Sequence, residues 1–133
     1  MVDKIFHVGY IPSMAWEVEY TDEFGEWWET LGEEEQIEID AVVGLLENLG
    51  HALPYPHSSG VKSSNHGNMR ELRIQHKGEP YRVLYAFDPR RTAILLIGGK
   101  KGGDARWYRK YVPLADKIYD EHLKALKKEK GGK

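Results

Sequence analysis

Five basic side chains lie where three predicted strands would bring them together. Arg70 and Arg73 stand on the first of these strands, Arg82 on the second, and Lys100 and Lys101 where the third ends. Side chains on neighbouring strands lie about 5 Å apart, so these groups can converge on a target the size of one phosphate. A planar guanidinium binds phosphate through two parallel hydrogen bonds, which suits phosphoryl chemistry without a metal ion. The alternative is a positively charged sheet edge that only resists aggregation.

A second group of candidate residues follows the third strand. Trp107, Tyr108, Arg109 and Lys110 begin a predicted helix. They would add rings for base stacking, a phenol that can move protons, and further positive charge. His66 stands in the loop that leads into the first basic strand, although an ordinary loop histidine is the simpler interpretation of it. Together with the basic residues of the strands, these residues favour a surface that binds nucleic acid.

Other catalytic signatures are absent from the sequence. The segment IGGKKGGD lacks both the spacing and the Gly-Lys-Ser/Thr ending of a phosphate-binding loop, and there is neither a G-x-G-x-x-G nor a G-x-S-x-G motif. No two of the six histidines are four residues apart, as in a helical zinc-hydrolase motif. With no cysteine, thiol catalysis, disulfides and iron–sulfur clusters are excluded. We therefore expect no metal and no cofactor.

Charge is divided unevenly along the 133 residues, although the net charge is only −2. Residues 1–60 contain 13 acidic side chains and one basic, whereas residues 61–133 contain 18 basic and 8 acidic. This division predicts one basic surface for an anionic partner and one acidic surface, or else two solvated faces without partners. The longest apolar run, Ala93 to Ile97, is far too short to cross a membrane, and no secretory signal is visible. We expect a cytoplasmic protein without membrane contact.

The first half of the chain predicts a strand followed by two helices. Residues 16–20 alternate apolar and acidic side chains, as in a half-buried strand, and Thr21 or Asp22 offers a helix N-cap. A short helix should run through Leu31, and a second from Glu33 to a stop at Gly50. Residues 51–68 are rich in Pro, Ser, Gly and Asn and are predicted to be one long loop.

The second half predicts a three-stranded antiparallel meander and two closing helices. The strands correspond to RELRIQH, YRVLYAFD and TAILLIGG, with turns between them. One face of the middle strand should carry Tyr81, Val83, Tyr85 and Phe87, and the other Arg82, Leu84 and Ala86. A short helix through ARWYRKY should precede another that begins at Pro113. We expect an N-terminal extension over residues 1–13, one domain over 14–128 and a frayed basic tail over 129–133.

From about Trp16 to Leu126 the chain resembles the RelE/HigB superfamily of type II toxins, in particular its phage-derived branch. The resemblance lies in the E-L-R strand, the P-Y-R-V-L-Y strand, the strand ending in Gly-Gly and a lysine cluster, and the R-W-Y…P-L-A-D-x-x-Y-D-E-H-L close. It implies an α+β fold: a RelE-like single domain with an N-terminal strand and helical hairpin packed on an antiparallel sheet, and C-terminal helices. It also implies a metal-independent, ribosome-dependent endoribonuclease that cuts mRNA and is held inactive by a cognate antitoxin, often a helix-turn-helix protein. The resemblance leaves open whether the chain forms a homodimer.

The resemblance also implies roles for individual residues. Arg73 and Arg82 match the basic strand positions that hold the scissile phosphate, and Lys101 matches a position that stabilises the charge of the transition state. Tyr108 falls near an aromatic acid/base, and Arg70, Lys100, Trp107, Arg109, Lys110 and His66 are expected to bind RNA. Whether Lys100 or Lys101 faces the phosphate is left open. Because related folds serve other tasks, a ParE-like inhibitor of DNA gyrase or a degenerate module that only binds its antitoxin are the alternative functions.

Overall fold

The computed structural model describes residues 15–103 and 105–131, and in this part of the chain five strands form one sheet in the order β1-β5-β4-β3-β2. The strands are β1 (Val18–Tyr20), β2 (Ser58–Gly60), β3 (Arg70–His76), β4 (Glu79–Phe87) and β5 (Ala93–Lys100). The helices are α1 (Asp22–Glu29), α2 (Glu33–Leu49), the 3₁₀ turn η3 (Gly50–Ala52) and α3 (Arg106–Gly131). β2 to β5 are joined antiparallel, whereas β1 lies parallel to β5. The expected α+β fold is confirmed.

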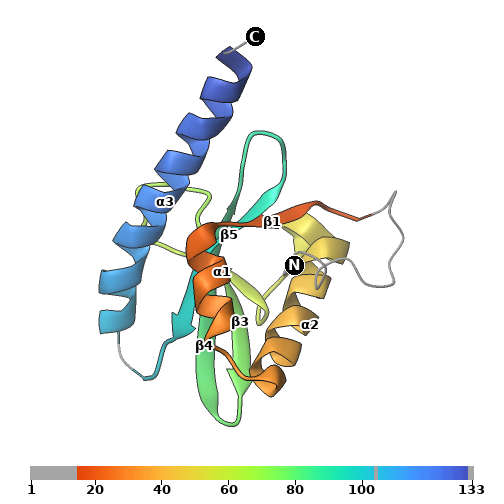
Figure 1. Cartoon of the computed structure of the whole chain (residues 1–133). Helices are drawn as coiled ribbons and strands as arrows, with labels where there is room; N and C mark the ends of the chain where they lie inside the picture. Colours follow the sequence, from red (N-terminus) through yellow and green to blue (C-terminus); the bar gives the residue numbers. More distant parts are fainter. Residues whose placement is uncertain (1–14, 104, 132–133) are drawn as a thin grey trace.

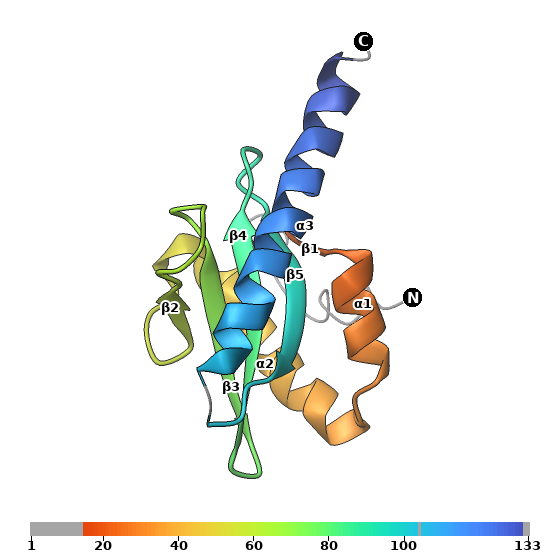
Figure 2. The same ribbon diagram turned by 90° about the vertical axis from the view of Figure 1, so that its left-hand side faces the viewer.

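Helices cover both faces of the sheet (Figures 1 and 2). α3 lies across one face, and α1 and α2 lie on the other. The central strand β4 is therefore buried on both sides, and its side chains alternate between two apolar cores. Tyr81, Val83 and Tyr85 pack toward α1 and α2, while Leu84 and Ala86 pack toward α3. This alternation is the one that the sequence predicts.

The caps of the two N-terminal helices also follow the sequence. The Thr21 hydroxyl accepts a hydrogen bond from the Phe24 backbone N–H at 3.1 Å, which places Thr21 at the N-cap of α1. α2 ends at Leu49, and its C-cap is Gly50, whose φ of +56° is one that side-chain-bearing residues rarely adopt. A Cβ added there would also lie 2.1 Å from the Trp16 ring. Gly50 is therefore required both by its backbone conformation and by close packing.

Two sequence predictions are corrected by the structure. Residues 51–68 are not one loop. The segment begins within η3 and contains the short strand β2, which pairs antiparallel with β3. The two expected C-terminal helices are one helix, α3, with Pro113 in its interior. An interior proline costs about 3 kcal/mol, but Val112 before it and Ala115 after it are both buried in the same core. Packing on the sheet therefore keeps the helix continuous.

The expected domain boundaries are only partly visible. Residues 1–13 lie outside the described residues, and α3 continues past residue 128 to Gly131. No helix in the described part of the chain is long and apolar enough to span a lipid bilayer.

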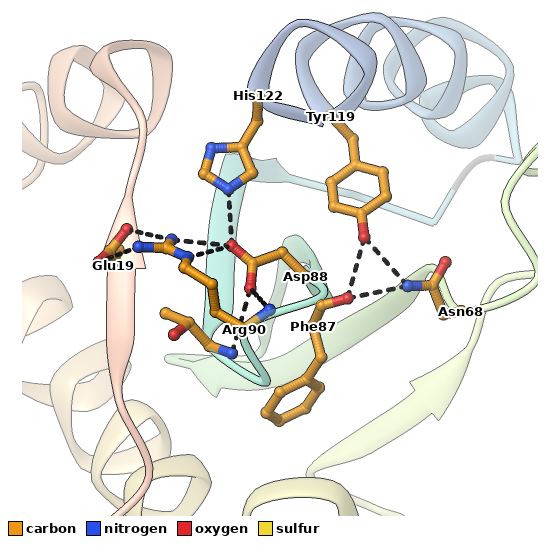
Figure 3. Close-up of polar contacts among 8 residues, drawn as sticks. Glu19, Asn68, Phe87, Asp88, Arg90, Tyr119 and His122 are labelled. Atoms are coloured by element: carbon orange, nitrogen blue, oxygen red, sulfur yellow. Dashed lines mark hydrogen bonds and ion pairs between the residues drawn. The ribbon is translucent and has the colours of Figure 1, made fainter. Parts of the chain in front are cut away.

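A buried carboxylate, Asp88, joins three parts of the fold (Figure 3). Its side chain is inaccessible to solvent and accepts hydrogen bonds from Arg90 Nη2 and His122 Nε2, both at 2.8 Å. Arg90 also reaches Glu19 of β1 at 2.8 Å. Burial alone would raise the pKa of Asp88, but the bonds from Arg90 and His122 outweigh it and leave the pKa lowered. The carboxylate thus ties the β4–β5 turn to α3 and to β1.

We predict that Asp88→Asn lowers the free energy of unfolding by about 2–4 kcal/mol at pH 7, because it breaks a buried ion pair. Stability from a lowered pKa is present above the ordinary value of 3.8 and is lost as pH falls through the folded value. The difference in free energy of unfolding between wild type and variant should therefore become smaller as the pH falls. Urea denaturation from pH 3 to 7 tests this, with Asp120→Asn as an exposed control that changes stability by less than about 1 kcal/mol. A gap that does not depend on pH would contradict it.

Candidate functional site

Two arginines stand directly opposite one another on neighbouring strands of the sheet. Arg73 of β3 and Arg82 of β4 are register partners, and both point to the face that carries α3. Arg73 keeps 27% of its side chain exposed, whereas Arg82 keeps only 7%. Like charges in this arrangement repel each other, so the pair needs a nearby anion.

Glu71 supplies that anion. It lies two residues before Arg73, hence on the same face of β3, and only 6% of its side chain is exposed. Its carboxylate accepts hydrogen bonds from Arg73 Nη1 at 3.1 Å, from Ser59 Oγ at 2.8 Å and from the Tyr108 hydroxyl at 2.7 Å. Its Oε1 also lies 3.5 Å from Arg82 Nε. Glu71, Arg73, Arg82 and Tyr108, named here the Glu71 cluster, form one connected network.

Tyr108 is the proton-bearing group of the Glu71 cluster. Burial raises the pKa of the Tyr108 phenol, and its hydrogen bond to Glu71 raises the pKa further. Arg82, whose Nε donates to the phenol oxygen at 3.3 Å, acts in the opposite direction. The net effect is a raised pKa, and Tyr108, like any phenol, carries a proton at neutral pH that it can donate.

The structure separates the two adjacent lysines. Lys101 Nζ lies 5.7 Å from the centre of the Tyr108 ring, and the Lys101 backbone N–H donates to Pro80 O at 2.8 Å. Lys100 points to the other face, where its Nζ lies 5.8 Å from the Tyr81 ring. The alternation of side chains along the strand therefore places Lys101, and not Lys100, beside the Glu71 cluster.

A cleft of about 380 Å³ opens beside the Glu71 cluster. It lies along the half of β3 that extends past β2, so this edge of the sheet is not covered by another strand. Both arginines of the cluster line it, together with residues of α2 and of the segment before β2: Glu38, Val42, Pro56, His57, Arg73, Ile74, Gln75 and Arg82. An anion in this cleft can reach both guanidinium groups.

Several predicted RNA-binding residues lie elsewhere. Arg70 points to the α1/α2 face, where its Nε donates to Ser58 Oγ at 3.0 Å. His66 pairs with Asp120 of α3 at 2.7 Å. Asp120 lies twelve residues beyond Tyr108, about 18 Å along the helix. Neither residue is brought to the Glu71 cluster.

The predicted stacking role of Trp107 is corrected by its burial. Trp107 is 8% exposed, stacks on Tyr111 with ring centres 4.7 Å apart, and covers Gly99, where an added Cβ would lie 2.7 Å from its Nε1. Its ring belongs to the core under α3. Arg109 and Lys110 on the next positions of α3 are exposed and remain available to an anionic partner.

Sequence reasoning missed Glu71, the centre of the cluster, although a signal for it exists. In E-L-R the glutamate and the arginine are two residues apart, which on a strand means the same face. Ser59 could not be found in this way, because its partner Glu71 is reached only through the pairing of β2 with β3. Among the described residues, no group of three His, Asp or Glu side chains could hold a metal ion.

Known proteins resemble this chain both in sequence and in fold. The family model described as phage-derived protein Gp49-like matches residues 26–120. A Mycobacterium tuberculosis protein named as toxin HigB2 is 36% identical over 113 residues, which cover 84% of this chain but 56% of HigB2. Another, named as toxin HigB3, is 39% identical over 98 residues, covering 73% of this chain and 84% of HigB3. The chain thus spans little more than half the length of HigB2.

Solved structures share the fold at low sequence identity. A chain of the archaeal RelE–RelB complex from Pyrococcus horikoshii has a TM-score of 0.50 at 16% identity, covering 68% of this chain and all of that one. A doubly substituted E. coli toxin RelE in the free state has a TM-score of 0.51 at 12% identity, covering 73% and 94%. The arrangement of helices and strands is therefore that of RelE.

We predict that Glu71→Gln lowers the free energy of unfolding by about 2–4 kcal/mol, because the buried Arg82 and the partly exposed Arg73 lose their counter-ion. Inorganic phosphate should then stabilise the variant more than the wild type, since a bound anion replaces the lost carboxylate. Thermal unfolding with increasing phosphate at constant ionic strength measures this. Glu79→Gln, an exposed change on the same sheet, is the control and should respond as the wild type does. Equal phosphate responses in Glu71→Gln and wild type would show that the cluster does not bind phosphate.

Proposed function

The chain belongs to the Gp49-like, HigB/RelE family of toxins from toxin–antitoxin modules, and on this premise we propose that it is an endoribonuclease that cuts mRNA on the ribosome. The observation that carries the proposal is the convergence of Arg73, Arg82, Lys101 and Tyr108 on one face of the sheet. Three positive charges and a protonated phenol beside a cleft are what cleavage of a phosphodiester needs when side chains supply the charge.

In the proposed reaction the RNA provides its own nucleophile. The 2′-hydroxyl attacks the neighbouring phosphorus, its proton leaves to water, and the bond from phosphorus to the 5′-oxygen breaks. Tyr108 gives its proton to that oxygen, so the products are a 2′,3′-cyclic phosphate and a free 5′-hydroxyl. The phenolate that remains lies 3.3 Å from Arg82 Nε and recovers a proton from water.

Charge stabilisation is the main task of the basic residues. Arg73 and Arg82 would hold the non-bridging phosphate oxygens from the cleft, and Lys101 would approach from the side of Tyr108. Such fixed charges contribute most when they are already in place before the reaction. Glu71 holds Arg73 and Tyr108 in position in the absence of RNA.

We also propose an antitoxin partner with acidic segments, because the face around the Glu71 cluster carries exposed cations on α3. Arg109 and Lys110 extend the positive surface beyond Arg73 and Lys101. A helix-turn-helix antitoxin would either cover this face or block entry to the ribosome by its bulk. Co-purification with the product of the neighbouring reading frame, followed by a translation assay, tests this. Full translation arrest by a stable complex would contradict it.

We predict that Arg82→Ala reduces mRNA cleavage by about 100-fold or more, by analogy with the loss of a charge-stabilising donor elsewhere. Arg82→Lys should restore little activity, since a point charge cannot replace two parallel hydrogen bonds. Primer extension on a reporter mRNA after induction gives the cleavage, and circular dichroism shows whether each variant folds. Lys101→Ala, at a less buried position, should also lose cleavage. Lys77→Ala, in the exposed β3–β4 turn where Lys77 pairs with Glu34, should not.

The same induction experiment separates the nuclease from a gyrase inhibitor. DNA supercoiling is measured alongside the transcripts. Intact transcripts together with altered supercoiling would refute the nuclease and favour the ParE-like alternative.

A further inference from the structure

An exposed aromatic ring stands next to the arginine pair. Tyr55, between η3 and β2, is 68% exposed. Arg73 Cζ lies 5.0 Å from the centre of its ring. The guanidinium covers one face of the ring, and the high exposure leaves the remainder open to solvent. A flat ring that is held beside a cation in this way is prepared to stack on another flat group.

The adjoining cleft favours an uncharged planar group over a second phosphate. Pro56, Val42 and Ile74 give it an apolar lining, and Glu38 places a carboxylate on the α2 side. That carboxylate would repel a phosphate, whereas the amino groups on the edges of nucleobases can donate to it. The arginines line the same cleft, so a phosphate and a base of the same strand can be bound side by side.

We propose that Tyr55 and the Arg73 guanidinium form a stacking platform for an unpaired nucleobase next to the phosphate bound by Arg73 and Arg82. This inference rests on the proposed nuclease function, because it takes the anion in the cleft to be the backbone of a single strand. Stacking on a tyrosine tolerates every base, since each base has a π-face. The platform therefore adds affinity for single strands without selecting their sequence.

Binding of two DNA hexamers tests the platform. One is a fluorescein-labelled single strand of six deoxyadenosines, which lacks the 2′-hydroxyl needed for cleavage. The other is an abasic hexamer with the same phosphates but no bases. By fluorescence anisotropy, wild type should bind the adenine hexamer about 10-fold more tightly than the abasic one. Tyr55→Ala should lose this difference, and Tyr55→Phe should keep it.

A control variant and the cleavage of mRNA separate the failure of the platform from the failure of the nuclease proposal. Ile37→Ala, which removes another exposed apolar side chain (62% exposed) from α2, should change neither affinity. If wild type does not distinguish the two hexamers, or if Tyr55→Ala still does, the platform is wrong even when mRNA is cleaved. If Tyr55-dependent binding is found while mRNA stays intact, the platform stands as a single-strand binding site and the nuclease proposal fails.

Discussion

Both faces of β4 are covered by helices, so each charged group that is buried on this strand or beside it must find its partner inside the protein. Arg82 within β4 and Asp88 directly after it are both buried, whereas Glu79 at the start of the strand is exposed to solvent. An unpaired buried charge costs several kcal/mol, which explains why Glu71 faces Arg82 and why Arg90 and His122 face Asp88. The two polar networks are thus consequences of a sheet that is covered on both sides.

The networks differ in what they leave accessible. Around Asp88, the hydrogen bonds come from the turn after β4 and from α3, and they close the structure there (Figure 3). Around Glu71, one member of the network, Arg73, remains partly exposed and lines a cleft. The need to pair buried charges therefore produces a structural network around Asp88, directly after β4. It also produces an accessible cluster around Arg82, in the first half of β4.

The division of charge along the sequence becomes a division in space. The acidic helices α1 and α2 lie on one face of the sheet and α3 lies on the other (Figure 2). The Glu71 cluster shares the α3 face with the cationic start of that helix. Glu71 is an acidic residue on the basic face of the sheet. Because it is buried and paired with arginines, it adds no exposed negative charge to that face. An anionic strand approaching the cleft therefore meets Arg73 and Arg82 of the basic face and, on the α2 side, the carboxylate of Glu38.

The sequence by itself determined the period-2 alternation of β4, the stop at Gly50, and the resemblance to the RelE/HigB toxins that the comparisons confirm. It narrowed the N-cap of α1 to Thr21 or Asp22, and the structure selects Thr21. These are local features, set by backbone geometry and by short motifs. Only the tertiary structure decided that Lys101, and not Lys100, lies beside the Glu71 cluster and that the Trp107 ring is buried. Only the tertiary structure shows that one helix continues through Pro113 and that Tyr55 lies beside Arg73. Each of these depends on strand register or on packing between segments far apart in the chain. Local propensity contains no information about such contacts, because their free energy arises only when the sheet and its covering helices have met.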